Sequence, residues 1–298
     1  MSRSNPKQLN VTMTDIEATY RSIIDCVNEK RWEDLPRDMH SHFVKNGQDS
    51  TPESYAAEIK SQGGKVEIIV DALTIDRESD QRLSAAVLVR FKPAGGSNEG
   101  IGAVDRTISF MEQHFVWFAE GKVSKILILA DHDDRQRQLS KPEASYKADL
   151  ISHEPPPRTS GTKLSASELH EKYRAYISCI NAQAMETDLH NFCSPEVVHN
   201  TKTLTINEYR LLIQEAFTAI PDITFDLPTV IADEEAQRVA ARIEFTGTPV
   251  GIIAGAKPNG RSVNFCEHVT YRFEEGKVAR VWSIVDWASY RAQLSERQ

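Results

Sequence analysis

Ionisable residues interrupt an apolar stretch near the end of the chain, and their types suit proton transfer. Glu267 and His268 lie within the run from Phe265 to Phe273, and Asp286 follows the next apolar run. A carboxylate buried in an apolar pocket has a raised pKa and can act as a general acid or base near neutral pH. Histidine titrates in that range without any perturbation. Glu267, His268 and Asp286 are therefore candidate catalytic residues.

The geometry of an extended strand separates these candidates. Successive side chains point to opposite faces of a strand, so Glu267 shares a face with Phe265 and His268 points the other way. Both reach one pocket only if a bulge interrupts the strand; otherwise His268 is an interface or surface residue. Asp286 is either a catalytic acid at a pocket mouth or the cap of a segment that begins at Trp287.

The same pattern of residues occurs twice in the chain. Glu120-Gly-Lys-Val123 recurs as Glu275-Gly-Lys-Val278, an offset of 155 residues from Glu120 to Glu275. The same offset relates three further pairs: Phe110 and Phe265, Glu112 and Glu267, and Asp131 and Asp286. The sequence therefore predicts two tandem copies of one fold, and a chain of 298 residues is long enough for two domains.

Each copy begins with residues at helical spacing and continues with segments rich in β-branched and aromatic residues. This order predicts an α+β fold with N-terminal helices packed on a curved, mostly antiparallel sheet. Pro155 to Pro157 cannot enter a helix or a central strand, so residues 141–163 are predicted to be a linker between domains 1–140 and 164–298. The expected strands are Val66–Leu73, Leu83–Phe91, Thr107–Phe118 and Lys122–Ala130, then Ile223–Val230, Val239–Gly247, Ser262–Phe273 and Lys277–Val285.

Composition narrows the classes of function. A formal net charge of −8 and the lack of Lys/Arg-rich runs argue against nucleic-acid binding. No stretch approaches the roughly 18 apolar residues of a membrane span, and four cysteines without a CxxC pair fit a reduced, cytoplasmic protein. The Gly-rich stretches 94–102 and 251–257 lack a phosphate-loop pattern and are expected to be rim loops. The acids and histidine of residues 131–134 share one loop, and neighbours on one loop rarely converge on an ion, so no metal is predicted.

The second copy resembles the SnoaL-like family, which belongs to the NTF2-like or cystatin-like α+β cones. The resemblance covers residues 165–295 and extends more weakly to 14–139. It is carried by His199-Asn200, Pro221-Asp222-Ile223, the run from Arg238 to Thr248, Asn259-Gly-Arg261, Glu275 to Trp282 with Asp286, and Gln293-Leu294.

The resemblance implies a conical pocket for a hydrophobic small molecule. Polyketide cyclases of this family use a buried carboxylate without metal or organic cofactor, and fungal relatives in natural-product pathways are similar in outline. The expected function is a cofactor-independent cyclase, isomerase or dehydratase acting on a polyketide- or terpenoid-type intermediate. The alternative is a non-catalytic ligand-binding or protein-interaction module. Family members dimerise through the sheet, which implies an intramolecular pseudo-dimer here, or a homodimer.

The family also suggests roles for residues around the pocket. In relatives the junction at His199 and Asn200 lines the pocket, so His199 is a further candidate catalytic residue. Asn200 is a candidate substrate-binding residue that can donate a hydrogen bond to an enolate; the other interpretation of this junction is a left-handed turn. The first copy has Lys45 in place of His199, which favours the second copy as the active one. Three aromatic residues are either substrate contacts or core: Tyr209, Tyr271 and Trp282.

The last strand departs from the family pattern. Relatives often read Glu-His-Trp-Asp where this chain has Arg280-Val-Trp-Ser283, so a serine occupies the place of the expected acid and Asp286 is the nearest carboxylate. Either the proton-transferring group has moved, or the chemistry differs.

Overall fold

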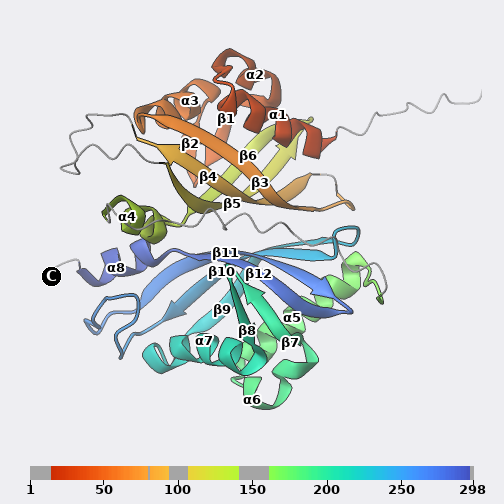
Figure 1. Cartoon of the computed structure of the whole chain (residues 1–298), viewed down its shortest axis with the longest axis vertical. Helices are drawn as coiled ribbons and strands as arrows, with labels where there is room; N and C mark the ends of the chain where they lie inside the picture. The colour runs from red at the N-terminus through yellow and green to blue at the C-terminus, as the bar shows by residue number, and fades with distance from the viewer. Residues whose placement is uncertain (1–14, 80, 94–106, 141–160, 296–298) are drawn as a thin grey trace, which may run out of the picture.

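The computed structural model describes residues 15–79, 81–93, 107–140 and 161–295. Within these ranges it contains two α+β units stacked on one another, each with a six-stranded sheet (Figure 1). Helices α1 to α3 cover the outer side of one sheet, helices α5 to α7 cover the outer side of the other, and the two sheets face each other. The predicted α+β fold in tandem form is confirmed. Most of the predicted linker, residues 141–160, lies outside the described residues.

The first unit begins with helices and ends with one. Its helical elements are α1 (Ile16–Asn28), η1 (Trp32–Asp34), α2 (Leu35–Asp38), α3 (Pro52–Ser61) and α4 (His132–Ser140). Its strands are β1 (Met39–Lys45), β2 (Gln48–Ser50), β3 (Lys65–Ile75), β4 (Arg82–Lys92), β5 (Ile108–Ala119) and β6 (Lys122–Ala130).

The second unit repeats this order. Its helical elements are α5 (Ala166–Asn181), α6 (Met185–Asp188), η2 (Leu189–Asn191), α7 (Ile206–Ala219) and α8 (Trp287–Ser295). Its strands are β7 (Cys193–His199), β8 (Lys202–Thr205), β9 (Thr224–Asp233), β10 (Arg238–Gly247), β11 (Val263–Glu274) and β12 (Lys277–Val285).

Both sheets have the same topology. The strand orders are β2-β1-β6-β5-β4-β3 and β8-β7-β12-β11-β10-β9. The four long antiparallel strands of each sheet were predicted, but the two short strands were not. β1 pairs in parallel with β6, and β7 pairs in parallel with β12, each through a shifted register. These short segments are polar and hold a proline in β7, so their strand character comes from long-range pairing rather than from local preference.

Local chemistry sets the ends of several elements. Ser165 accepts a hydrogen bond from the backbone of Glu168, whose side chain accepts one from the Ser165 backbone, and this capping box starts α5. The hairpins β5–β6 and β11–β12 turn at Glu120-Gly121 and Glu275-Gly276, where all four residues have positive φ. Two-residue hairpin turns of this kind require left-handed backbone at both positions, which glycine adopts at no steric cost.

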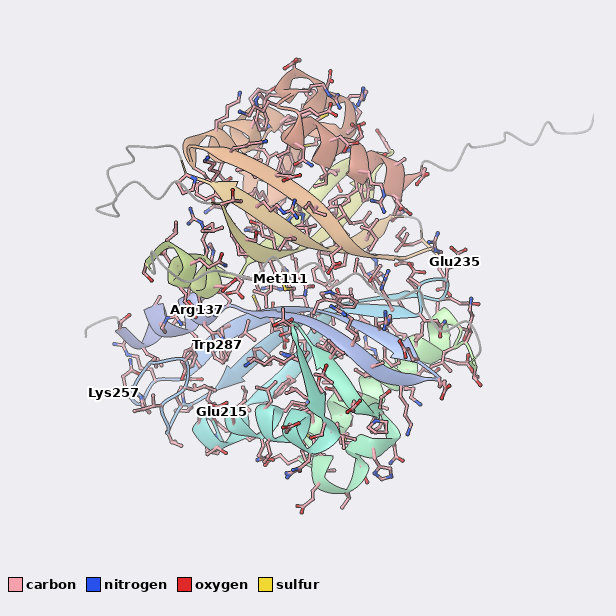
Figure 2. All side chains as sticks on the ribbon, viewed as in Figure 1. Met111, Arg137, Glu215, Glu235, Lys257 and Trp287 are labelled. Carbon is pink, nitrogen blue, oxygen red and sulfur yellow. The ribbon has the colours of Figure 1, made fainter. Side chains whose placement is uncertain are left out.

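The strands bury both faces, which explains why their sequences are so apolar. One face packs against the helices of its own unit, and the other packs against the opposite unit. Side chains of both units meet between the sheets in small clusters, and Met111 lies there (Figure 2). Gln113 and His268, equivalent residues of the two copies, touch directly: His268 Nδ1 lies 3.1 Å from the Gln113 carbonyl oxygen. The sheets therefore pack about a local two-fold relation.

Candidate functional site

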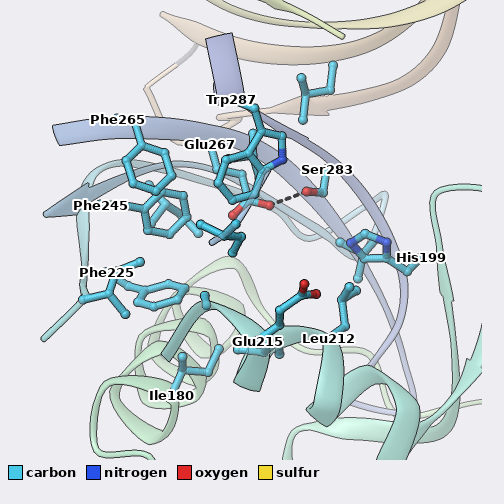
Figure 3. A pocket seen from close by; sticks show the side chains of 18 of the residues that line it. Ile180, His199, Leu212, Glu215, Phe225, Phe245, Phe265, Glu267, Ser283 and Trp287 are labelled. Atoms are coloured by element: carbon cyan, nitrogen blue, oxygen red, sulfur yellow. Dashed lines mark hydrogen bonds between the residues drawn. The ribbon is translucent and has the colours of Figure 1, made fainter. Parts of the chain in front are cut away.

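A cavity of about 550 Å³ lies inside the second unit, between its sheet and helices α5 and α7. Strands β9 to β12 supply most of one wall and the two helices supply the other (Figure 3). The apolar wall includes Ile180, Ile213, Phe225, Phe245, Phe265 and Trp287. A cavity of this size and lining suits a small hydrophobic ligand.

Glu267 is the carboxylate in the sheet wall of this cavity. Alternation along β11 turns it inward with Phe265, as predicted, and the Ser283 hydroxyl donates a hydrogen bond of 2.5 Å to its Oε1 (Figure 3). Burial raises the pKa of Glu267 to about 7, although the hydrogen bond from Ser283 acts in the opposite direction. The carboxyl group can thus exist in either protonation state near neutral pH, which general acid–base chemistry requires.

Three tyrosines place hydroxyl-bearing rings around the same cavity. Tyr209 and Tyr271 line it as predicted, and Tyr176 of α5 joins them. The hydroxyls of Tyr176 and Tyr209 lie 2.9 Å apart, and burial raises the pKa of each phenol. Tyr176 was not predicted to line a pocket, although its helical spacing from Tyr173 indicated that it could face inward. Neutral phenols are hydrogen-bond donors suited to a developing oxyanion.

His199 and Asn200 both border the cavity, but they play different parts. Burial, followed by the charge of Lys202, lowers the pKa of His199 to about 4, so the ring is neutral at physiological pH. Asn200 has a left-handed φ of 52°, and its side-chain amide pairs with the backbone of Ser283 at 2.8 and 3.0 Å. Asn200 therefore holds the strand that carries the hydroxyl bound to Glu267.

The structure corrects the expectation that His268 and Trp282 act in this cavity. Both side chains lie on the face of the sheet turned toward the first unit, because no bulge reverses the alternation of β11 at this point. His268 Nε2 lies 3.0 Å from a guanidinium nitrogen of Arg242. Trp282 donates a hydrogen bond of 2.9 Å to Asp71. Both residues belong to the contact between the units.

Asp286 also lies outside the cavity. Its carboxylate accepts hydrogen bonds from the backbone and hydroxyl of Ser289, at 3.0 and 2.6 Å, and so caps the start of α8. The capping interpretation therefore describes Asp286, and the expectation of a catalytic acid at this position is corrected. Asp131, its equivalent, likewise accepts a hydrogen bond of 2.9 Å from the backbone of Asp134 at the start of α4.

Three further carboxylates line the cavity, and neither Glu215 nor Asp133 was expected there from the sequence. Glu215 extends from α7 toward the space bordered by Glu267 and His199 (Figure 3). Asp131 and Asp133 come from the first unit. Asp131 and Asp133 reach the cavity only through the packing of the two units, so no local sequence signal could have placed them there, whereas Glu215 lies on α7 of the second unit itself. In the part of the chain that the structure describes, no three His, Cys, Asp or Glu side chains form a group able to hold a metal ion.

Comparisons with known proteins found a matching family model and similar solved structures. Residues 170–294 match the family model described as SnoaL-like polyketide cyclase. A SnoaL-like polyketide cyclase from Agrobacterium tumefaciens C58 is 38% identical over 43% of this chain and 98% of its own, with a TM-score of 0.40. TsrD from Streptomyces laurentii is 21% identical over 45% of this chain and 98% of its own, with a TM-score of 0.41. A search of curated proteins found no match.

The fold and the cavity define a tandem pair of α+β cones, one of which holds a ligand-sized pocket. On the family model and the 38% identity, the chain belongs to the SnoaL-like polyketide cyclase family through its C-terminal half. None of the helices in the described ranges has the length and apolar character needed to cross a membrane.

Proposed function

We propose that the second unit is a cofactor-independent enzyme that moves protons on a hydrophobic polyketide- or terpenoid-type molecule, as a cyclase, isomerase or dehydratase. The observation that carries the proposal is Glu267, a carboxyl group set in an apolar wall of a cavity of about 550 Å³ and oriented by Ser283. Among the described residues of the second unit, Glu267 is the group that combines burial, access to a ligand and a pKa of about 7.

The chemistry begins with Glu267 in its carboxylate form. It removes a proton from a carbon next to a carbonyl group of the substrate, and the electron pair of the broken C–H bond moves onto the carbonyl oxygen. Phenol donors of Tyr176, Tyr209 and Tyr271 stabilise that oxygen by hydrogen bonds. Bond formation or rearrangement of the enolate follows, and the carboxylic acid of Glu267 returns the proton. The apolar wall keeps water away from the enolate.

Proton transfer can be tested before the natural substrate is known. We would incubate the full chain with a panel of apolar cyclic ketones and β-dicarbonyl compounds in D2O and follow deuterium incorporation by NMR. Glu267→Gln should lower the exchange rate by about 10²- to 10⁴-fold, the usual contribution of a general base. Glu112→Gln changes the equivalent residue of the first unit and should leave the rate within about twofold. Equal rates for wild type and Glu267→Gln would refute the assignment.

One observation favours a second candidate, a ligand-binding module without turnover. Asp286 caps α8, and Ser283 stands where relatives carry an acid, so Glu267 is the one carboxylate in the sheet wall of the cavity. A module of this kind would bind apolar compounds and catalyse no exchange. Native mass spectrometry of the purified chain, compared with its exchange activity, separates the two: a retained ligand without exchange supports the module.

A further inference from the structure

The cavity of the second unit is completed by the first unit. Asp131 and Asp133, at the start of α4, line its rim, and α4 packs against α8 (Figure 1). Asp133 forms an ion pair with the two terminal nitrogens, Nη1 and Nη2, of the Arg291 guanidinium on α8. The same guanidinium lies 3.4 Å from the carbonyl oxygen of Ala254, a residue that also lines the cavity. One arginine thus ties the first unit to two segments of the rim.

The rim has one sign of charge. The ionisable residues that line the cavity are Asp131, Asp133, Glu215, Glu267 and His199. Among the described lining residues there is no lysine or arginine, and His199 is neutral because burial lowers its pKa to about 4. Arg291 stands behind the rim and is neutralised by Asp133. Asp133 thus occupies the Arg291 guanidinium, which could otherwise bind an anionic group at the rim, and the charge of Asp131 repels such a group.

We infer that the first unit is a specificity element of the second unit's pocket, in which Asp131 and Asp133 discriminate against ligands that carry an anionic group. The ligand class is then an uncharged apolar molecule, such as a ketone or ester, rather than a free acid. This inference rests on the proposed function in taking the cavity as the ligand site, and it adds the charge class of the ligand and the role of the first unit.

The two copies carry different residues at these positions, as expected if the first unit acts on the cavity of the second and not the reverse. Asp133 corresponds to Ala288, and Arg291 corresponds to Gln136. The ion pair and the second carboxylate therefore exist only where the first unit meets the cavity of the second, and the local two-fold relation cannot reproduce them on the other side. Packing of the sheets alone would not require this charge pattern.

Two probes that differ by one anionic group test the inference directly. N-phenyl-1-naphthylamine is uncharged, and 8-anilino-1-naphthalenesulfonate is the same ring system with a sulfonate; both report binding to the full chain by fluorescence. The wild type should bind the uncharged probe more tightly. Asp131→Asn combined with Asp133→Asn should reduce the ratio of the two dissociation constants by about three- to tenfold, and added salt should shrink this change.

Matched variants exclude indirect causes. Asp49→Asn removes one negative charge from exposed β2 of the first unit and should leave the ratio unchanged. Adding Arg291→Gln to the double variant removes the guanidinium that Asp133→Asn releases, and part of the reduction should remain. Ala216→Phe enlarges a side chain that lines the cavity on α7, so it should weaken the binding of both probes.

The outcomes separate this inference from the proposed function. A ratio that is the same in wild type and in the double variant overturns the inference, while the exchange assay on Glu267 is unaffected. If Ala216→Phe leaves the binding of both probes unchanged, the cavity is not the ligand site. Both the inference and the proposed function would then be wrong.

Discussion

Glu112 and Glu267 occupy the same place in the two units but have different partners. In the first unit Glu112 lies 3.0 Å from His114 Nε2, and the other ring nitrogen of His114 lies 2.8 Å from the Tyr20 hydroxyl. In the second unit the position of His114 is taken by Val269, and Glu267 receives its hydrogen bond from Ser283. The fold fixes where the carboxyl group stands, and its neighbours decide what the group can do.

The difference assigns separate tasks to the two copies. Tyr20, His114 and Glu112 form a continuous hydrogen-bonded chain in which both ring nitrogens of a buried histidine are engaged, and such a network specifies a core. Glu267 instead faces a cavity and has one hydroxyl partner. A carboxyl group with a single hydroxyl partner in apolar surroundings is costly when ionised, and that cost makes it reactive.

Replacing Glu112 or Glu267 by glutamine should change the free energy of unfolding in opposite directions, and this is the largest expected difference between the two units. Because its folded-state pKa is raised from 4.5 to about 7, Glu267 stabilises the fold below pH 4.5 and loses that contribution as the pH rises through about 7. Glu267→Gln should therefore raise the free energy of unfolding by about 3 kcal/mol at pH 8.5 and change it little at pH 4.5. Urea unfolding of the full chain at both pH values measures this.

Glu112→Gln is the matched control for that measurement. It disturbs the bond to His114 and should lower stability by about 1–2 kcal/mol at pH 8.5, the opposite sign. A destabilising effect of Glu267→Gln at pH 8.5 would contradict the view that the ionised carboxyl group of Glu267 is destabilised by burial.

The contact between the units should respond to acid through His268, whose equivalent in the first unit is Gln113. Burial lowers the pKa of His268 to about 3 from an ordinary value of 6.5, and the ring faces Arg242. Its contribution is full above pH 6.5 and is lost as the pH falls toward about 3, which amounts to about 2.7 kcal/mol by pH 4.5.

His268→Gln makes the two units alike at this position and removes the titration. The variant should lose about 2.3 kcal/mol less stability than wild type between pH 6.5 and 4.5, because the unfolded-state histidine is already half protonated at pH 6.5; urea unfolding measures this. His199, whose pKa is lowered to about 4, adds acid sensitivity of the same sign but is present in both proteins. If the free energies of unfolding of the two proteins depend on pH in the same way, then burial between the units does not lower the pKa of His268.

Much of the fold followed from the sequence, because its signals are local or repeated. The alternation around Glu267 depends on residues close together in the chain, and the repeat offset depends on comparing two copies of one pattern. The inward direction of Glu267 and the outward direction of His268 came from alternation alone. Tyr209 and Tyr271 were placed by the resemblance.

The remainder depends on contacts between distant segments. The short strands β1 and β7 form only by pairing with β6 and β12, and Trp282 turned out to pack between the units rather than in the pocket. The rim residue Asp133 reaches the cavity only because α4 packs on α8. Such placements need the arrangement of the two units, which one sequence does not encode in any local pattern.

The smallest effect tests the single hydrogen bond that distinguishes Glu267 from an isolated carboxyl group. Ser283 donates to the carboxylate and so lowers its pKa against the effect of burial. Ser283→Ala should move the midpoint of the pH–rate profile for deuterium exchange upward by up to about one pH unit, since a hydrogen bond to a charged group is worth roughly 1.5 kcal/mol or more. Ser283→Thr retains the hydroxyl and should leave the midpoint in place. If Ser283→Ala and wild type share one midpoint, the protonation state of Glu267 is set by burial alone, and the Ser283 hydroxyl has no electrostatic part in the reaction.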